Sequence, residues 1–303
     1  MKVFKTIFIL AITFYCINVS AQNVFFEKDS IPNKKRTLAT SISIGTIWAG
    51  SITGLAAVWY KDSWGDGFHF FDDGLEWLQM DKFGHAYTGY HLQRNVFNAY
   101  NWSGQPRSRS LWLGAAISFG YLANFEILDG FSKDWGFSMW DLFANFSGVA
   151  MFTGQELLWE EQKIGFKFSA SPSPYAQYRP EALGASFSER LLKDYNGQTY
   201  WLNFTPNNFF DTPLPDWLSF SFGYSINEKL HGFENHFVVN HENNLLEFNA
   251  YRQYLFSLDV DFEKIKTNKP WLRSIFKALN HVKVPFPALE LSKNKISAYP
   301  VYF

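Results

Sequence analysis

Three predicted helical segments each carry polar residues along one face, and this pattern constrains the fold more than any other feature of the sequence. The segments cover residues 78–100, 109–130 and 138–162. Residues three or four positions apart share a helix face. The polar residues at such spacings are Asp81, His85, Glu126, Asp129, Asp141 and Asn145. Because buried polar groups must satisfy one another or bind a ligand, we expect the three faces to meet in one polar site.

The start of the third of these helices has its own local signal. Ser138 and Asp141 have the spacing of a capping box, although the usual second residue is Glu or Gln. This spacing predicts that the helix begins near Ser138 and that Asp141 has a capping role. Gly148 continues the same stripe and would permit a close approach of a neighbouring helix.

The predicted site suits two kinds of chemistry. Oxygen ligands with a single imidazole suit a divalent metal ion such as Mg²⁺, Mn²⁺, Ca²⁺ or Zn²⁺, with all six polar residues as candidate ligands. The Glu-x-x-His element of di-iron bundles does not occur in the three predicted helices. His85 could instead act as a general base that Asp81 or Glu126 orients. These three residues are therefore the candidate catalytic positions.

A purely structural interpretation explains the same residues. Lys82 would pair with Glu126 or Asp129, Asp141 would cap its own helix, and Asn145 would bond to backbone groups. Other positions are weaker candidates. His69 could add a ligand from a loop, His91 should face elsewhere, and the region of His236 and His241 is too irregular to interpret. The segment 193–201 predicts a structured turn because it contains Asn-Gly.

The N-terminus has the pattern of a secretory signal peptide. Lys2 and Lys5 precede an apolar core at 7–17, and Val-Ser-Ala then predicts cleavage after Ala21. The alternative is a retained anchor, but the apolar run is shorter than the roughly 20 residues that a span needs. The only cysteine, Cys16, lies within this peptide, and the residues before it do not resemble a lipoprotein-processing site. We therefore expect a mature chain without cysteine or lipid.

An uncharged stretch follows at 37–60, between Arg36 and Lys61, and it is rich in Ser, Thr, Gly and Ala. Its length permits a bilayer span, and its small residues permit close helix packing. A buried helix of the bundle fits equally and requires no second insertion event, so we favour the buried helix.

The second half of the chain has the period-two alternation of β-strands. The clearest runs are 217–225, 251–262 and 295–303, and a short helix is predicted near 271–279. The end at Phe303 after alternating aromatics is similar to the last strand of an outer-membrane barrel, but too few strands accompany it. We therefore expect an α+β fold: a signal peptide at 1–21, a bundle of about four membrane-associated or buried helices at 22–163, and a loop-rich region with a small sheet at 164–303.

Composition narrows the class of partner. The net charge of −1 becomes −3 once Lys2 and Lys5 are removed, which argues against a nucleic-acid partner. Phosphate-binding and dinucleotide motifs are missing, which argues against a nucleotide. Aromatic residues make up 20% of the chain, a content that suits a membrane interface, a broad protein contact or an aromatic core. The expected partner is a membrane surface or an envelope protein complex.

The chain resembles the YfiM-like family of periplasmic proteins, a domain of unknown function, over about residues 75–155. The resemblance is carried by Asp81-Lys82-x-x-His85, Glu126-x-x-Asp129, Trp135-Gly136-Phe137-Ser138-x-x-Asp141 and Gly148. The motif LKDYNGQTYWL at 192–202 is similar to the long form found in Bacteroidota. The same order of elements is more loosely similar to VanZ-like membrane proteins, which implies contact between the bundle and lipid.

Two functions are consistent with these observations. The first is a structural or accessory protein at the periplasmic face of the outer membrane, with a buried His/carboxylate site. The second is a metal-binding enzyme that acts on an envelope lipid or polyprenyl phosphate. We favour the first because no nucleophile or complete catalytic motif requires the second.

Overall fold

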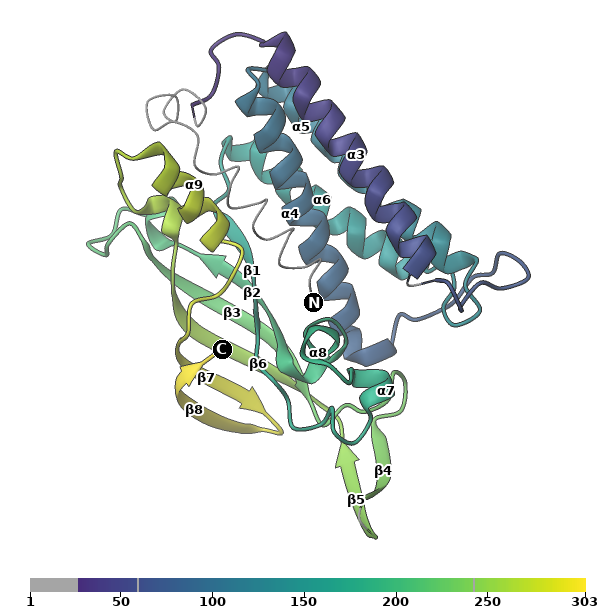
Figure 1. Cartoon of the computed structure of the whole chain (residues 1–303). Coiled ribbons are helices and arrows are strands. Elements are labelled where there is room, and N and C mark those ends of the chain that lie inside the picture. The colour runs from purple at the N-terminus through teal and green to yellow at the C-terminus, as the bar shows by residue number, and fades with distance from the viewer. Residues whose placement is uncertain (1–26, 59, 242) are drawn as a thin grey trace, which may run out of the picture.

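The computed structural model describes residues 27–58, 60–241 and 243–303, and it consists of a layer of long helices packed beside a six-stranded sheet (Figure 1). The predicted α+β fold is confirmed. The signal peptide, its cleavage after Ala21 and Cys16 lie outside the described residues.

The helical layer contains four long helices: α3 (Lys34–Val58), α4 (Met80–Trp102), α5 (Arg107–Gly130) and α6 (Met139–Trp159). The last three match the predicted helices to within a few residues. A loop and the short helix η1 (Glu76–Gln79) lead into α4. A Cβ atom added at Gly148 would collide with the carbonyl oxygen of Ala86, so α4 and α6 pack in backbone contact, as the position of Gly148 predicted.

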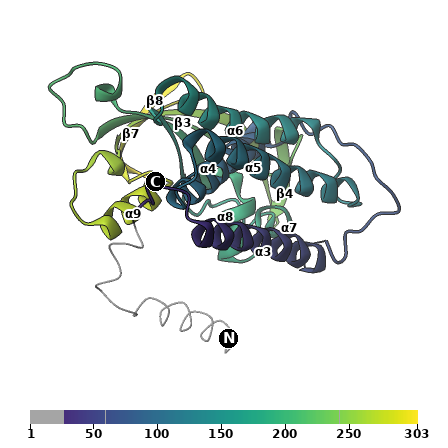
Figure 2. The same cartoon turned by 90° about the horizontal axis from the view of Figure 1, so that it is seen from above.

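α3 corrects the expectation of a buried helix. Only 6% of its most apolar window is buried, and Leu38, Ile42 and Ile47 are exposed. Figure 2 shows α3 running along the outside of the other long helices. Its contacts with the bundle include hydroxyl pairs such as Ser51 with Tyr121, because small and polar residues line the side that meets α4 and α5. By length and composition alone, α3 and α5 could each cross a membrane.

The sheet is antiparallel throughout and larger than the small sheet that the sequence predicted. Its strands, in spatial order, are β1 (Ile164–Ala170), β2 (Gln198–Phe204), β3 (Leu218–Asn227), β6 (Tyr251–Val260), β7 (Phe286–Ser292) and β8 (Lys295–Tyr302). The alternating runs predicted from sequence form β3, β6 and β8. The hairpin of β4 (His236–His241) and β5 (Asn244–Asn249) projects from one end (Figure 1).

The core lies between α4 and the first strands of the sheet. Phe83 stacks on Tyr224 with ring centroids 4.7 Å apart, and Tyr87 and Tyr90 contact Phe166. The predicted short helix is α9 (Pro270–Leu279). The remaining short elements are α7 (Pro180–Leu183), α8 (Phe187–Lys193), η2 (Tyr195–Gly197), η3 (Pro206–Asn208) and η4 (Phe262–Lys264). Of these, η2 lies beside the first turn of α4, where the polar residues gather.

Candidate His-carboxylate site

The site begins at an unusual entry into α4. Trp77, Leu78 and Gln79 all have positive φ angles, of 47°, 50° and 67°. This conformation costs roughly 1–2 kcal/mol for each L-residue. Contacts from the rest of the fold hold it: Trp77 N donates to the Gly232 carbonyl at 2.7 Å, and Tyr224 Oη donates to the Leu78 carbonyl at 2.5 Å. The fold thus maintains backbone strain immediately before Asp81 and His85.

Lys82 lies among three carboxylates. Its Nζ atom is 2.8 Å from Asp73, 2.9 Å from Asp81 and 2.5 Å from Asp141. Burial opposes the charged form, but the carboxylates of Asp81 and Asp141 together raise the pKa of Lys82. The prediction that Lys82 pairs with Glu126 or Asp129 is wrong, because its side chain extends toward the loop and the first turn of α6.

His85 lies among α4, α5 and α6. Its Nδ1 atom is 3.1 Å from Asn145 Oδ1 and 3.5 Å from Glu126 Oε1. Its Nε2 atom is 3.5 Å from Asp141 and 3.7 Å from Asp81. The three helix faces therefore meet as the spacings predicted.

Asn145 determines how the imidazole is oriented. The Nδ2 group of Asn145 donates to Glu126 Oε1 at 3.0 Å, so its oxygen accepts a hydrogen bond from His85 Nδ1. In a neutral imidazole this arrangement places the lone pair on Nε2, directed at Asp81 and Asp141. The prediction that Asn145 bonds to backbone groups is therefore wrong, because its amide bridges two side chains.

Glu126 is the most deeply buried acid of the site, at 1% exposure. Burial raises its pKa to about 8, against the effect of the nearby His85. Its second oxygen, Oε2, has no hydrogen-bond partner among the described residues. Burial therefore favours the protonated form of Glu126 near neutral pH.

Asp141 and Asp129 differ from their predicted roles. Ser138 Oγ accepts a hydrogen bond from the backbone N–H of Asp141 at 3.0 Å, which confirms that α6 begins there. The carboxylate of Asp141 faces Lys82 instead of capping its helix. Burial and the charge of Asp81 raise its pKa. Asp129 accepts a hydrogen bond from Tyr60 at 2.6 Å, a contact that the sequence did not predict.

Two residues of the cluster were not predicted. Asp73 belongs to the Gly- and Asp-rich loop before α4, and it also accepts a hydrogen bond from Ser138 at 2.5 Å. Tyr195, in η2, donates to Asp81 Oδ1 at 2.8 Å. The Asn-Gly motif correctly predicted a turn around Tyr195. Helical spacing could not reveal a contact between residues 114 positions apart.

The other candidate histidines lie outside this cluster. His69 Nε2 is 2.5 Å from the Trp135 carbonyl, and His236 pairs with Asn249 at 3.0 Å. His91 faces away from the site, as predicted, and is 2.6 Å from the Phe166 carbonyl.

Three side chains of the site lie close enough together to offer ligands to one divalent metal ion. Asp81, His85 and Asp141 each offer one ligand atom, all within 4.8 Å of one another. A single metal ion that forms bonds of about 2.0–2.2 Å to each ligand atom could bind between atoms at these separations. However, Lys82 already contacts Asp141 Oδ1, and Tyr195 already contacts Asp81 Oδ1. The residues fit a metal ion only if Lys82 moves aside.

Comparison with known proteins gives one match. Residues 66–154 match a family model described as "Predicted periplasmic lipoprotein (DUF2279)". No curated protein and no solved structure matches the chain. The matched range contains α4, α5 and most of α6, together with Asp73, Lys82 and His85. Over this range the chain is similar to a family of periplasmic lipoproteins of unknown function, which supports a location in the periplasmic cell envelope.

Proposed function

We propose that this protein is a structural or accessory protein of the cell envelope, located at the periplasmic face of the outer membrane, in which the His-carboxylate site joins separate parts of the fold. One observation carries the proposal. The ammonium group of Lys82 lies within 3 Å of Asp73, Asp81 and Asp141, so the site contains its own cation.

The connectivity of the site supports a structural role. Its side chains come from five segments: the loop before α4, the three helices α4, α5 and α6, and η2. Hydrogen bonds from Tyr195 to Asp81 and from Asn145 to Glu126 join the segments directly. Such a network stabilises one arrangement of the helices because each buried polar group depends on its partners.

The location is supported by the sequence and by the family match. The N-terminal residues have a signal-peptide pattern, and the match describes periplasmic lipoproteins. The looser resemblance to VanZ-like proteins favours a site near lipid. We propose a membrane surface or an envelope protein complex as the partner.

A metal-binding enzyme is the second candidate, and the orientation of His85 favours it. Asn145 holds Nδ1, which leaves Nε2 directed at Asp81 and Asp141, and Glu126 Oε2 is unpartnered among the described residues. Imidazoles that bind metal ions are commonly oriented by such a hydrogen bond. In this role the site would act on an envelope lipid or a polyprenyl phosphate.

Metal analysis of the purified chain distinguishes the two functions. We expect no stoichiometric metal, and an unchanged melting temperature on addition of a chelator. The variant His85→Gln should melt at a lower temperature, whereas His236→Gln, at an exposed histidine on β4, should melt like the wild type. A stoichiometric metal that His85→Gln loses and His236→Gln keeps would contradict the structural role and support the enzyme.

Fractionation tests the location separately. The chain should be recovered with the outer membrane after cell breakage and density separation. Recovery with the inner membrane would contradict this location and would favour α3 and α5 as spans.

A further inference from the structure

The face of the sheet that packs on α4 through Phe166, Tyr200 and Tyr224 continues beyond the helix as an exposed apolar surface. In-register pairing aligns Leu202, Phe222, Phe256 and Leu289 in one row across four strands. The exposed apolar residues of this face, called the outer face below, are Leu202, Phe222, Tyr254, Phe256, Leu258, Leu289, Leu291 and Ile296. Their exposure ranges from 37% at Leu258 to 76% at Ile296. An apolar surface of this extent marks a contact site.

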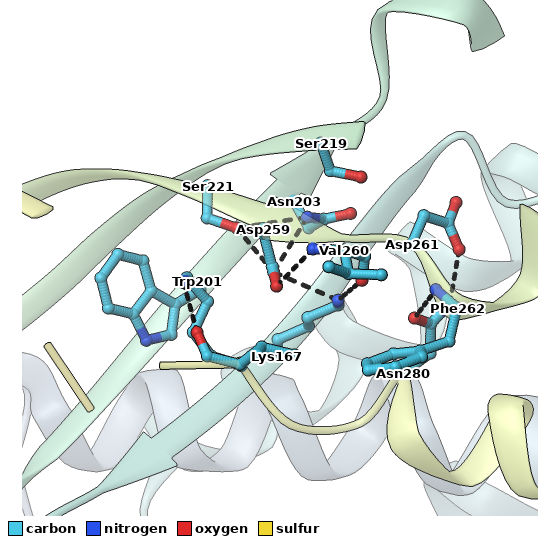
Figure 3. Close-up of polar contacts among 12 residues, drawn as sticks. Lys167, Trp201, Asn203, Ser219, Ser221, Asp259, Val260, Asp261, Phe262 and Asn280 are labelled. Atoms are coloured by element: carbon cyan, nitrogen blue, oxygen red, sulfur yellow. Dashed lines mark hydrogen bonds and ion pairs between the residues drawn. The ribbon is translucent and has the colours of Figure 1, made fainter. Parts of the chain in front are cut away.

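The opposite face of the sheet is buried and carries many polar side chains around a small apolar cluster of Trp201, Leu255 and Ala288; Figure 3 shows part of this face. Lys167, 1% exposed, lies 3.1 Å from Asp259, which is fully buried. Asn203 and Ser221 donate to the same carboxylate at 3.1 and 2.9 Å. Antiparallel sheets of soluble proteins usually turn the apolar face inward and the polar face to water. In this sheet the apolar face is only partly covered by α4 and the rest of it is exposed, although the polar face is buried. Exposed apolar residues that alternate with buried polar ones also occur in sheets that face lipid.

Charged residues border the outer face at the end of the sheet where β6 and β8 begin. Arg252 is exposed at the start of β6, and Lys295 is exposed at the start of β8. At the other end of β6, the backbone N–H of Phe262 donates to Asn280, which follows α9. The outer face is therefore an apolar band with exposed cations at one end and α9 at the other.

The helix α9 has the composition of an interfacial helix. Trp271, Ile275 and Leu279 are exposed and four residues apart, so they form one stripe. Arg273 and Lys277 are basic, and the helix has no acidic residue. Helices with an apolar stripe and basic residues bind at the surface of membranes with anionic lipids.

We propose that the outer face, with α9 at its end, binds a phospholipid bilayer that contains anionic lipid. The inference rests on the proposed envelope location and identifies the surface that would hold the protein there. The apolar rows contact hydrocarbon, and the cations of α9 contact phosphate groups.

Flotation with vesicles of phosphatidylethanolamine and phosphatidylglycerol tests the proposal. The purified chain should float, and the triple variant Phe222→Ser, Phe256→Ser, Leu289→Ser should lose at least about tenfold in bound fraction, since each change removes a large apolar side chain. The matched control is Phe187→Ser, Phe210→Ser, Leu245→Ser, at exposed positions outside the outer face, and it should float like the wild type.

A second variant tests the charge contribution. Arg273→Gln with Lys277→Gln should weaken binding by about fivefold per charge on vesicles with phosphatidylglycerol, and less on neutral vesicles. Circular dichroism should show that all variants keep the fold of the wild type.

Three outcomes would overturn the lipid assignment. The first is that the wild-type chain does not float with the vesicles, and the second is that the triple variant floats as well as its control. The third is that the wild type forms a dimer that the triple variant does not form, while neither the wild type nor the variant binds vesicles. The last result would assign the outer face to a second copy. Neither metal analysis nor cell fractionation depends on these variants, so failure of this inference and failure of the proposed function are distinguishable.

Discussion

At the scale of single residues, Lys82 is the most consequential side chain of the site. One ammonium group forms ion pairs with three carboxylates that come from a loop and two helices. A buried ionic network adds little stability over an apolar core, but removal of one partner leaves uncompensated charge. The stability of this site therefore depends on the single cation.

Replacement of this cation should be costly. Lys82→Met should lower the free energy of unfolding by about 3 kcal/mol, because three acids lose their counter-charge. Urea denaturation measures the change. Lys266→Met is the control, since Lys266 is 91% exposed and its pair with Asp216 lies at the surface. Equal losses in the two variants would contradict the role assigned to Lys82.

A second residue-scale feature is the stack of His91 on His281, with ring centroids 4.1 Å apart. Burial lowers the pKa of His91 well below its usual value, helped by the nearby charges of His281 and Arg94. The folded chain therefore keeps His91 neutral, whereas the unfolded chain binds a proton below about pH 6.5. This contribution to stability is present above that pH and is lost as the pH falls.

The variant His91→Gln should remove that dependence. As the pH falls from 6.5 to 5, the free energy of unfolding should decrease less steeply in the variant than in the wild type. The two slopes should differ by up to about 1.4 kcal/mol per pH unit. Urea denaturation at several pH values gives both curves. The raised pKa of Glu126 acts in the opposite direction in this range but is common to both chains, so it cancels in the difference. Parallel curves would contradict the prediction.

At the scale of elements, the packing of α4 against α6 positions the site. Gly148 and Gly89 lie where the two helices meet, and an added Cβ atom at Gly89 would lie 2.5 Å from the Asn145 carbonyl. The backbones are therefore close enough for Asn145 to reach His85. A wider spacing would separate the polar faces.

Two glycines of α6 allow a matched test. Gly148→Ala should destabilise the chain by about 1–3 kcal/mol, because the methyl group meets the backbone of Ala86. Gly154→Ala has open space around it and should stabilise the helix by roughly 0.5–1 kcal/mol. Thermal melting with calorimetry measures both. Changes of the same sign would show that the close approach at Gly148 is not required.

At the scale of the whole molecule, the helical layer and the sheet share one core. Phe83 of α4 stacks on Tyr224 of β3, and Tyr87 donates a hydrogen bond to the His281 carbonyl at 2.9 Å. Because the layers bury apolar surface on each other, we expect them to unfold together.

Cooperative unfolding can be measured with two probes. Far-ultraviolet circular dichroism and tryptophan fluorescence should give the same midpoint in urea, as two-state unfolding requires. Phe83→Ala should reduce the free energy of unfolding by about 3 kcal/mol and so lower the midpoints of both probes by an equal amount. Phe187→Ala, at an exposed position, should leave both midpoints unchanged. Separate midpoints would mean that the layers are independent units.

The sequence by itself determined the helices, the alternating strands and the polar faces of α4, α5 and α6, because these features depend on spacings of two to four residues that local backbone geometry imposes. Only the tertiary structure decided that Lys82 pairs with Asp73, that Tyr195 reaches Asp81 and that α3 lies outside the bundle. It also decided how much of each face of the sheet is exposed. Alternation states only that two faces differ, whereas their environments depend on contacts between residues far apart in the chain.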